Sequence, residues 1–411
     1  FSNNFREFRG QCDKTVAYFN RTGRNFASLQ YEVIIMGVVV KKYGGTSVGS
    51  TERIKNVASQ IIKAREKETE IVVIVSAMSG ETDRLIALGR QICKMPDERE
   101  MDMLVSTGEQ VSSALLSMAL IDLGCPTVSL NAPQIEILTD KSHTKAKICK
   151  INTDRIIKEL TKGKVVIVAG FQGITEDEDI TTLGRGGSDT TAVAIAGALQ
   201  ADVCEIFTDV DGVYTADPRI VPEARKLDVI SYEEMLEMAS LGAKVLHSRS
   251  VELAKKFGVK IHVLSSFVDV HGTIVTEEGA GMEELLVSGV TANAKEAKIT
   301  VIDIPDKPGM AGRLFSALAD ANINVDMIVQ SETRGKTNDI SFTVDKTDLQ
   351  KAIAVTKESV EIIGAGSVVY DQDIAKVSIV GVGMKSHSGV ASLMFKALAE
   401  HNINIEMIST S

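Results

Sequence analysis

Between Val38 and about Val275, short apolar runs of strand length alternate with stretches that carry apolar residues at helical spacing. The clearest helical stretch spans Ile54 to Ile62, with apolar residues at the first, fourth, fifth, eighth and ninth positions. This alternation predicts an α/β fold with a mostly parallel sheet, helices on both faces and ligands at the carboxyl ends of the strands. The predicted strands are Val38–Lys42, Ile71–Ser76, Val165–Ala169, Val203–Phe207 and Lys260–Leu264, and further predicted helices are Glu109–Leu123, Ile151–Thr161 and about Ser248–Phe257.

After about Gly279 the sequence repeats itself with an offset of 80 residues, as from Asn322 to Asn402. Each copy is expected to form a strand, a tight turn, a helix and a second strand, which ends near Ile328 in the first copy and Ile408 in the second. The first copy continues into the order βαββαβ, which is ferredoxin-like. The second stops after its second strand. Two small related domains are therefore predicted after the α/β domain.

The expected boundaries are 1–35, 36–278, 279–373 and 374–411. The first segment lacks periodicity, and we expect an extension that takes no part in the fold. An organelle transit peptide is the alternative, which Glu7, Asp13 and Glu32 disfavour because such peptides are poor in acidic residues. The other segments are the α/β domain, the first repeat and an incomplete second repeat.

Composition excludes several classes of protein. Lys and Arg number 45 against 55 Asp and Glu, a net charge of −10, which disfavours nucleic-acid or membrane-surface binding. No apolar run approaches the length of about 20 residues that a membrane span requires. The five cysteines are scattered, which favours reduced thiols and a cytoplasmic protein over a disulfide framework or a zinc site. No histidine pair has the spacing of metal ligands, so no metal-binding side chains are assigned.

Two glycine-rich segments are candidate anion sites. Lys42–Ser47 follows the first strand and combines a lysine with two glycines and two hydroxyls, although a plain turn explains it equally well. Gly184–Thr191 opens an apolar helix. Helix capping accounts for its hydroxyls and Asp189, but capping requires neither Arg185 nor three glycines, and an arginine there suits an anionic ligand.

Other polar segments follow predicted strands or open helices. Thr208–Arg219 contains three aspartates, a tyrosine and an arginine, which suit phosphates and a hydrated Mg²⁺, although two consecutive turns are the simpler interpretation. Ser106–Glu109 enters a helix, where Glu109 could merely complement the helix dipole. Ser76–Met78 is a weaker candidate, and Lys244 is by default a solvated lysine. We find no Ser/His/Asp triad, CxxC pair or general-base histidine.

In this order and spacing, the segments from Lys42–Ser47 to Gly242–His247 resemble those of aspartokinases, and the repeat resembles their paired ACT domains. The resemblance covers about Met36 to Ser411. It implies the three-layer αβα amino acid kinase fold followed by ferredoxin-like ACT domains. It further implies transfer of a phosphoryl group from ATP, with Mg²⁺, to the β-carboxylate of L-aspartate, giving 4-phospho-L-aspartate for lysine, threonine and methionine biosynthesis.

The resemblance also implies roles for individual residues. Catalytic roles would fall to Lys42, Arg185, Asp189 and Asp209. Residues around ATP would be Lys42, Tyr43, Gly44, Gly45, Thr208, Asp209, Tyr214, Thr215, Ala216, Asp217, Pro218, Arg219, Lys244 and Val245. Residues around aspartate would be Thr46, Ser76, Thr82, Glu109, Arg185, Gly186, Gly187 and Ser188, with Glu109 on the α-ammonium group and Arg185 on the α-carboxylate.

The ACT pair implies feedback regulation by lysine, threonine or both, through a site shared by two subunits and hence at least a homodimer. Effector contacts would come from Asp306, Gly309, Ala311, Gln330, Asn404 and Ile405. Without the resemblance, Pro308-Gly309 would be interpreted as a turn that begins a helix. Ser248 departs from the proline that many relatives carry after the histidine, and the incomplete second repeat leaves regulation open.

Two other functions compete with this interpretation. One is another amino acid kinase, acting on glutamate or a nucleotide, against which the ACT pair and the segments Ser76–Met78 and Gly108-Glu109 argue. The other is a non-catalytic amino-acid sensor. Lys42, Arg185 and Asp209 together argue against a sensor, because sensing requires none of them.

Overall fold

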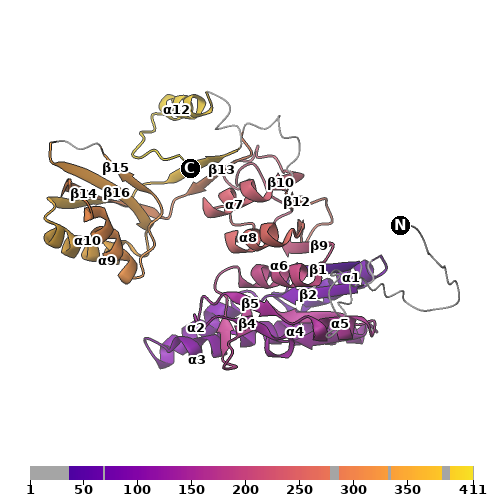
Figure 1. Ribbon diagram of the computed structural model, residues 1–411. Helices are drawn as coiled ribbons and strands as arrows, with labels where there is room; N and C mark the ends of the chain where they lie inside the picture. Colours follow the sequence, from indigo (N-terminus) through magenta and orange to yellow (C-terminus); the bar gives the residue numbers. More distant parts are fainter. Residues whose placement is uncertain (1–36, 68–69, 278–286, 332–334, 382–388, 411) are drawn as a thin grey trace, which may run out of the picture. The chain divides into compact units, whose positions relative to one another are not determined.

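The computed structural model describes residues 37–67, 70–277, 287–331, 335–381 and 389–410 (Figure 1). These residues form two compact units. The N-terminal unit holds the described residues up to Val213, Lys226–Leu236, and those from Val245 to 277. The C-terminal unit holds Tyr214–Arg225, Glu237–Lys244 and the described residues from 287 onward. The predicted N-terminal extension, residues 1–35, lies outside the described residues.

An eight-stranded sheet forms the centre of the N-terminal unit, in the order β10-β12-β11-β9-β1-β2-β6-β3. Neighbouring strands are parallel except for β11 and β12, which confirms the predicted mostly parallel sheet. The strands are β1 (Val38–Tyr43), β2 (Glu70–Val75), β3 (Thr127–Leu130), β6 (Val165–Ala169), β9 (Val203–Thr208), β10 (Val229–Ser231), β11 (Ile261–Ser265) and β12 (Thr273–Thr276).

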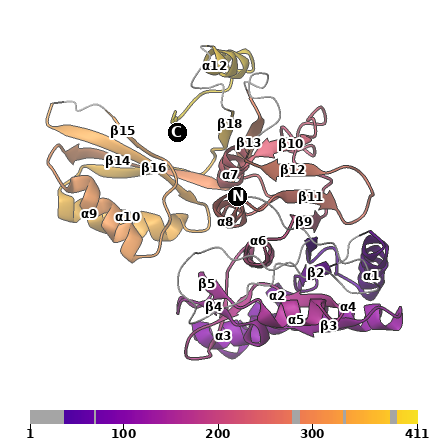
Figure 2. The same ribbon diagram turned by 45° about the vertical axis from the view of Figure 1, so that its right-hand side comes forward.

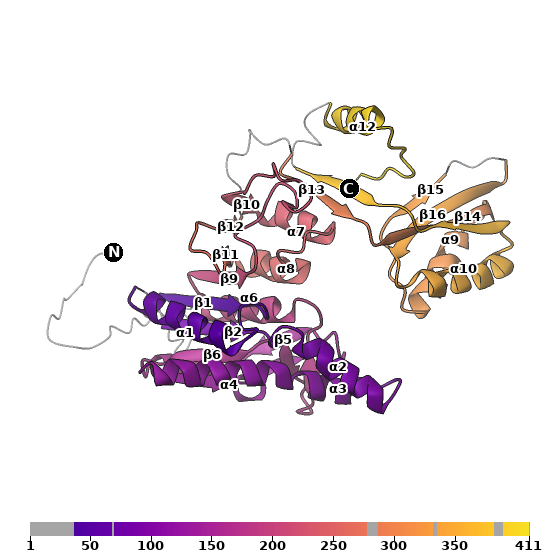
Figure 3. The same cartoon turned by 180° about the vertical axis from the view of Figure 1, so that it is seen from behind.

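Helices cover both faces of this sheet. Tyr43 on β1 packs among buried side chains of α1 (Thr51–Arg65), and α4 (Thr107–Asp122) joins the same cluster. Figure 3 shows the ribbons of α1 and α4. Lys42, the preceding residue, points to the opposite face and contacts α6 (Gly187–Leu199), against which α8 (Ser248–Phe257) packs. The remaining helices are α2 (Glu81–Ile92), α3 (Glu98–Val105), η1 (Pro133–Ile135), α5 (Asp154–Leu160) and α7 (Tyr232–Ser240).

Local sequence signals set several of these boundaries. Ser50 caps α1 by accepting a hydrogen bond from the N–H of Arg53, and Asp97 caps α3 in the same way through Arg99 and Glu100. Gly258 ends α8 in the left-handed conformation, with φ of 66°. Capping residues thus place the helix ends, while the apolar stripes decide which face is buried.

A second, smaller sheet was not predicted. It has the order β5-β4-β7-β8 and comprises β4 (Ile137–Thr139), β5 (Ile148–Ile151), β7 (Gln172–Ile174) and β8 (Ile180–Thr182). β8 leads directly into the glycine-rich segment that begins at Gly184. The short strands of this sheet therefore position that segment.

Among the described residues, Glu98–Asp122 is the one helical segment whose length and apolar character match a membrane span. Half of its most apolar window is buried within the protein. It also carries two buried carboxylates, Asp102 and Glu109. These are features of helices in the interior of a folded domain, which is how α3 and α4 pack here.

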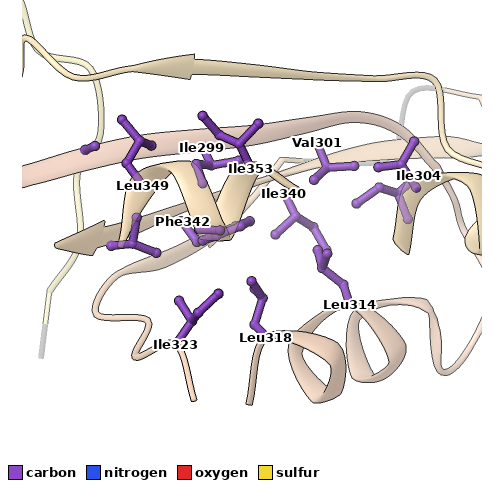
Figure 4. Close-up of a cluster of buried hydrophobic side chains, with 14 of the residues drawn as sticks. Ile299, Val301, Ile304, Leu314, Leu318, Ile323, Ile340, Phe342, Leu349 and Ile353 are labelled. Carbon is purple, nitrogen blue, oxygen red and sulfur yellow. The ribbon is translucent and has the colours of Figure 1, made fainter. Parts of the chain in front are cut away.

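In the C-terminal unit, the first repeat forms a four-stranded sheet in the order β15-β16-β14-β17, with α9 and α10 side by side (Figure 2). The elements are β14 (Glu296–Pro305), α9 (Met310–Asp320), β15 (Ile328–Gln330), β16 (Thr337–Asp345), α10 (Leu349–Ile363) and β17 (Ser367–Asp371). Buried aliphatic side chains and Phe342 fill the space between sheet and helices (Figure 4). The predicted ferredoxin-like fold is confirmed.

The second repeat contributes β18 (Lys376–Val380) and α12 (Val390–Glu400). β18 pairs with β13 (Gly289–Asn293) in a separate antiparallel two-stranded sheet. The second strand predicted to end near Ile408 does not form, because residues 402–410 join none of the described ladders. In the first repeat the corresponding strand begins only at Ile328.

Candidate active site

The parallel register brings four strand ends to one edge of the large sheet. Tyr43 is level with Val75 and Phe207, and Val75 is level with Ala169. Hydrogen bonds join the loops that follow, from Ser76 N–H to the Tyr43 carbonyl at 3.1 Å and from Gly44 N–H to the Phe207 carbonyl at 3.2 Å. The loops after β1, β2, β6 and β9 therefore meet where a parallel sheet binds its ligands.

A cavity of about 370 Å³ opens at this edge. Its walls come from the loops after β1, β2 and β6, from the first turn of α2, from α4, and from the segment that begins α6. The lining residues are Lys42, Gly45, Ser76, Ala77, Met78, Ser79, Gly80, Thr82, Asp83, Glu109, Phe171, Gly184, Gly186, Gly187, Ser188 and Asp189.

Lys42 and Asp189 form the charged pair of the cavity. The Lys42 Nζ lies 2.5 Å from Asp189 Oδ1, and both side chains are largely buried. Lys42 comes from the end of β1 and Asp189 from the first turn of α6, so the pair joins a strand end to a helix N-terminus. An ammonium group held beside a helix N-terminus is suited to an anionic ligand.

Glu109 supplies an unusual carboxylate on another wall. It is 3% exposed, and its Oε1 accepts a hydrogen bond from Ala77 N–H at 3.0 Å. Its Oε2 is buried without a partner among the described residues. Burial raises the pKa of Glu109 to about 7, and the hydrogen bond from Ala77 opposes the rise only partly. A buried, incompletely paired carboxylate in a cavity is suited to a cationic group of a ligand.

Glycines allow the walls to approach one another. A Cβ at Gly45 would lie 2.8 Å from the Ala77 carbonyl oxygen. Gly186 has φ of 67°, and a Cβ there would lie 2.3 Å from the Cβ of His247. At these positions no other residue fits without displacing backbone or a neighbouring side chain.

Not every predicted site residue of the N-terminal unit lines the cavity. Arg185 lies on the segment between two lining residues and is exposed. Asp209 is also exposed, and its carboxylate accepts a hydrogen bond from the Thr208 hydroxyl at 3.1 Å. Other predicted residues outside the lining are Tyr43, Gly44, Thr46, Thr208 and Val245.

The remaining predicted ATP residues belong to the C-terminal unit: Tyr214, Thr215, Ala216, Asp217, Pro218, Arg219 and Lys244. Arg219 Nη2 lies 2.7 Å from Asp217 Oδ2, and hydrogen bonds from Arg219 hold the pKa of Asp217 below its ordinary value. Thr215 N–H bonds to the Arg225 carbonyl at 2.9 Å. This segment is thus organised by its own contacts within the unit.

Ser79, Gly80 and Asp83 line the cavity but were not predicted from the sequence. The sequence did carry a signal, because Ser79-Gly80 is a turn-forming pair that follows a buried strand. The described residues contain no group of three His, Cys, Asp or Glu side chains suited to a metal ion.

The predicted effector residues lie in the two repeats. Asp306 and Gly309 belong to the turn between β14 and α9, where Gly309 precedes the helix with φ of 91°. Ala311 is in the first turn of α9, and Gln330 ends β15. In the second repeat Asn404 and Ile405 are exposed and outside regular secondary structure.

Comparisons with known proteins agree with this architecture. The amino acid kinase family matches residues 37–265, and the ACT domain matches residues 299–359 and 377–411. An aspartate kinase of Pseudomonas putida is 55% identical over 377 residues, which are 92% of this chain and 92% of that protein.

Two solved structures of Escherichia coli aspartokinase III share the fold. The complex with aspartate and ADP (R-state) has a TM-score of 0.76 at 25% identity, over 91% of this chain and 94% of that one. The complex with lysine and aspartate (T-state) has a TM-score of 0.73 at 26% identity, with the same coverage.

Proposed function

This chain belongs to the aspartokinases, ACT-containing members of the amino acid kinase family, and we propose that it transfers the γ-phosphoryl group of ATP to the β-carboxylate of L-aspartate. The product is 4-phospho-L-aspartate, which enters lysine, threonine and methionine biosynthesis. The observation that carries the proposal is one cavity that combines the Lys42–Asp189 pair with the buried carboxylate of Glu109. The cytoplasm is the proposed compartment.

The chemistry requires charge neutralisation more than proton transfer. The β-carboxylate of aspartate has a free pKa of about 3.9, so it is already ionised at neutral pH and needs no general base. Two anions must meet instead, and phosphoryl transfer depends mainly on positioning and electrostatic stabilisation. Lys42 and the backbone N–H group of Gly45 supply the opposing charge, and Asp189 orients the Lys42 ammonium group.

Recognition of aspartate is divided between two charges. Glu109 Oε2, which has no partner among the described residues, receives the α-ammonium group. Arg185 holds the α-carboxylate, as the guanidinium group suits a carboxylate geometrically. The remaining contacts are proposed for Thr46, Ser76, Thr82, Gly186, Gly187 and Ser188. The E. coli relative was solved with aspartate, which supports this substrate.

ATP and Mg²⁺ complete the proposal. Lys42 and Gly45 both line the cavity, which would place phosphates beside the ammonium group, and the E. coli relative was solved with ADP. ATP contacts are proposed for Thr208 and Asp209, for 214–219, and for Lys244 and Val245. The described residues contain no cluster of three side chains suited to a metal ion, and Mg²⁺ does not require one, because it commonly uses one or two protein carboxylates plus phosphate oxygens. Asp209 would hold Mg²⁺ beside the phosphates, where the ion would neutralise part of their charge.

Regulation is proposed to act through the ACT repeats. Lysine, threonine or both would bind at Asp306, Gly309, Ala311 and Gln330, with Asn404 and Ile405 of the second repeat, in a site that two subunits share. The E. coli relative was solved with lysine in a structure designated the T-state, which supports an amino-acid effector. An effector reduces activity only if it binds the less active state more tightly.

One assay tests these proposals together. The chain is incubated with ATP, Mg²⁺ and L-aspartate, and the acyl phosphate is trapped with hydroxylamine, with and without lysine plus threonine. We expect hydroxamate that requires aspartate and ATP and that the two amino acids suppress. Hydroxamate without suppression would contradict the regulation alone. A folded chain that forms none, or that prefers glutamate, would contradict the proposed reaction.

A further inference from the structure

Asp102 is a fully buried carboxylate that does not line the cavity. It lies on α3, is 0% exposed, and is surrounded by the small sheet and its loops. Isolated burial of a carboxylate is costly, so its partners show why the fold retains it. Three groups donate hydrogen bonds to it: the Thr182 hydroxyl at 2.5 Å, Thr144 N–H at 2.9 Å and His143 Nδ1 at 2.9 Å.

Two of these donors belong to the loop after β4. Thr144 has φ of 65°, in the left-handed region that a β-branched residue rarely adopts. The hydrogen bond from its N–H to Asp102, with that of the neighbouring His143, holds the loop in this conformation. Asp102 therefore fixes a backbone shape that the loop sequence does not favour by itself.

The third donor, Thr182, ends β8 immediately before the glycine-rich segment. Its carbonyl accepts a hydrogen bond from Ala146 N–H at 2.9 Å, so the same loop is tied to β8 twice. The next glycine, Gly184, packs directly on this loop, since a Cβ there would lie 3.1 Å from the Thr144 carbonyl oxygen. Asp102 thus contacts both the loop after β4 and the end of β8, from which the segment that carries Arg185 continues.

Arg249 closes the same arrangement from α8. Its guanidinium group donates to the Leu183 carbonyl at 2.8 Å and to the Ala146 carbonyl at 2.7 Å. Leu183 is therefore held by Arg249 on its carbonyl, and its N–H bonds to the Phe171 carbonyl at 2.8 Å. The segment enters the cavity wall with little freedom to shift, although Arg185 itself is exposed.

We propose that Asp102 is a positioning residue for aspartate recognition, acting through Thr182 and Thr144 on the segment Leu183–Gly187. This inference rests on the proposed function, because it takes Arg185 as the group that holds the α-carboxylate. Asp102 is not among the residues that line the cavity. Its role is to keep the Arg185 backbone where the guanidinium group reaches the bound amino acid.

The test compares two variants with a matched control. Asp102→Asn keeps the shape but removes the charge and one acceptor, and Thr182→Val removes one donor and keeps the volume. Asp179→Asn is the control, because Asp179 also contacts α3, through an ion pair with Arg99 at 2.7 Å, yet its side chain is partly exposed and lies on the other side of β8 in sequence. Hydrogen exchange, steady-state kinetics and thermal unfolding are measured for each.

We expect faster amide exchange at residues 143–145 and 183–187 in both variants, with α4 protected as in the parent. The KM for aspartate should rise about 10-fold or more, as small misplacements of a binding group do, while the KM for ATP stays within about 3-fold. Discrimination between aspartate and its α-amide, which retains the β-carboxylate acceptor, should fall. In an Arg185→Ala background, Asp102→Asn should add little further loss.

Several outcomes would overturn the proposal. Unchanged exchange at residues 183–187 would show that Asp102 does not hold the segment. Faster exchange with unchanged discrimination, or full additivity with Arg185→Ala, would show a purely structural role. If the parent itself fails to phosphorylate aspartate, the proposed function fails, and the exchange data still decide whether Asp102 restrains the segment.

Discussion

Lys41 and Lys42 are adjacent in the sequence yet lie on opposite faces of β1. Lys42 Nζ contacts Asp189 in the cavity wall, whereas Lys41 Nζ lies 2.5 Å from Glu205 Oε2 on the α1 face. Alternation along a strand therefore separates two buried ammonium groups into different environments. Their equal charge makes them a matched pair for testing the reaction.

Lys42→Met should lower kcat by about 100-fold or more, because it removes a charge that opposes the phosphoryl group in the transition state. Lys41→Met should keep kcat within a few-fold while lowering the thermal midpoint, since it leaves Glu205 without its cation. Steady-state kinetics and thermal unfolding of both variants make the comparison. If Lys42→Met and Lys41→Met lose kcat equally, the proposed role of Lys42 in the reaction is wrong.

Glu109 predicts a dependence on pH in the neutral range. With a pKa of about 7 in the free protein, it becomes ionised only as the pH rises through 7, and only the ionised form pairs with the α-ammonium group. The kcat/KM for aspartate should therefore rise across this range and level off above it. Glu109→Gln should lower kcat/KM and remove the inflection, which a pH series for both proteins would measure.

The same residue affects stability with the opposite sign. Because the folded-state pKa lies above the ordinary value of 4.5, Glu109 favours folding below pH 4.5, and this contribution is lost as the pH rises through 7. The free parent should be less stable than Glu109→Gln at pH 8, by about 3 kcal/mol at most. Urea unfolding at pH 5 and pH 8 measures this difference, and a Gln variant that is less stable at pH 8 would contradict it.

At the scale of elements, the turn into α6 depends on Gly186. Gly186→Ala would combine a left-handed backbone with a Cβ placed 2.3 Å from His247. Gly258→Ala is the matched control, because Gly258 has φ of 66° but no heavy atom within 4 Å of an added Cβ. The control should cost about 1–2 kcal/mol of stability and leave activity intact.

Gly186→Ala should lose more stability than this control and lower kcat/KM for aspartate by about 10-fold or more, because the segment with Arg185 must shift. Thermal unfolding and steady-state kinetics on both variants distinguish the cost of the left-handed backbone from the steric clash with His247. If the two variants lose similar stability and keep similar kcat/KM, His247 moves aside without displacing the segment that carries Arg185.

The sequence predicted the elements whose pattern is locally complete. Val165–Ala169 was predicted with its observed bounds because a buried parallel strand reads as an uninterrupted apolar run. The small sheet was missed, since strands of three or four residues such as β7 and β8 carry too few positions for a period. The strand predicted to end near Ile408 does not form, because a strand requires a partner that local sequence does not specify.

In the candidate site, too, residues in local motifs were predicted and a residue that depends on tertiary contacts was missed. Cavity residues such as Lys42, Glu109 and Asp189 stood in recognisable motifs. Asp102 stood in none, because its importance arises from donors 41 to 80 residues away in sequence. Hydrogen-bond partners at that separation are fixed by tertiary packing, which a single sequence does not display.

At the scale of the whole molecule, the two repeats are joined by crossed ion pairs. Asp326, in the loop before β15, pairs with Lys376 on β18 of the second repeat. Glu406, 80 residues after Asp326, pairs in turn with Lys298 on β14 of the first repeat. In each pair, the loop after the helix of one repeat contacts the first strand of the other repeat. These contacts connect the segments that carry the proposed effector residues of the two repeats.

The carboxylates around the two lysines differ in burial, and this difference makes a prediction. Lys376 is 9% exposed and also lies 3.0 Å from the buried Glu296, whereas Lys298 pairs with a half-exposed Glu406. Lys376→Met removes the cation beside the buried Glu296, which keeps only its hydrogen bond from the Asn293 amide among the described contacts, and should cost about 3 kcal/mol or more. Lys298→Met should cost about 1 kcal/mol or less. Urea unfolding followed by a probe in the C-terminal unit measures both.

The same pair of variants tests whether these contacts transmit regulation. If Asp326 positions the strand that carries Gln330, Lys376→Met should raise the concentration of lysine plus threonine needed for half-inhibition, with uninhibited turnover near that of the parent. Lys298→Met should change it less. Inhibition curves from the hydroxylamine assay measure this concentration. An equal shift in both variants would show that inhibition does not depend on the buried pair of Lys376 and Glu296.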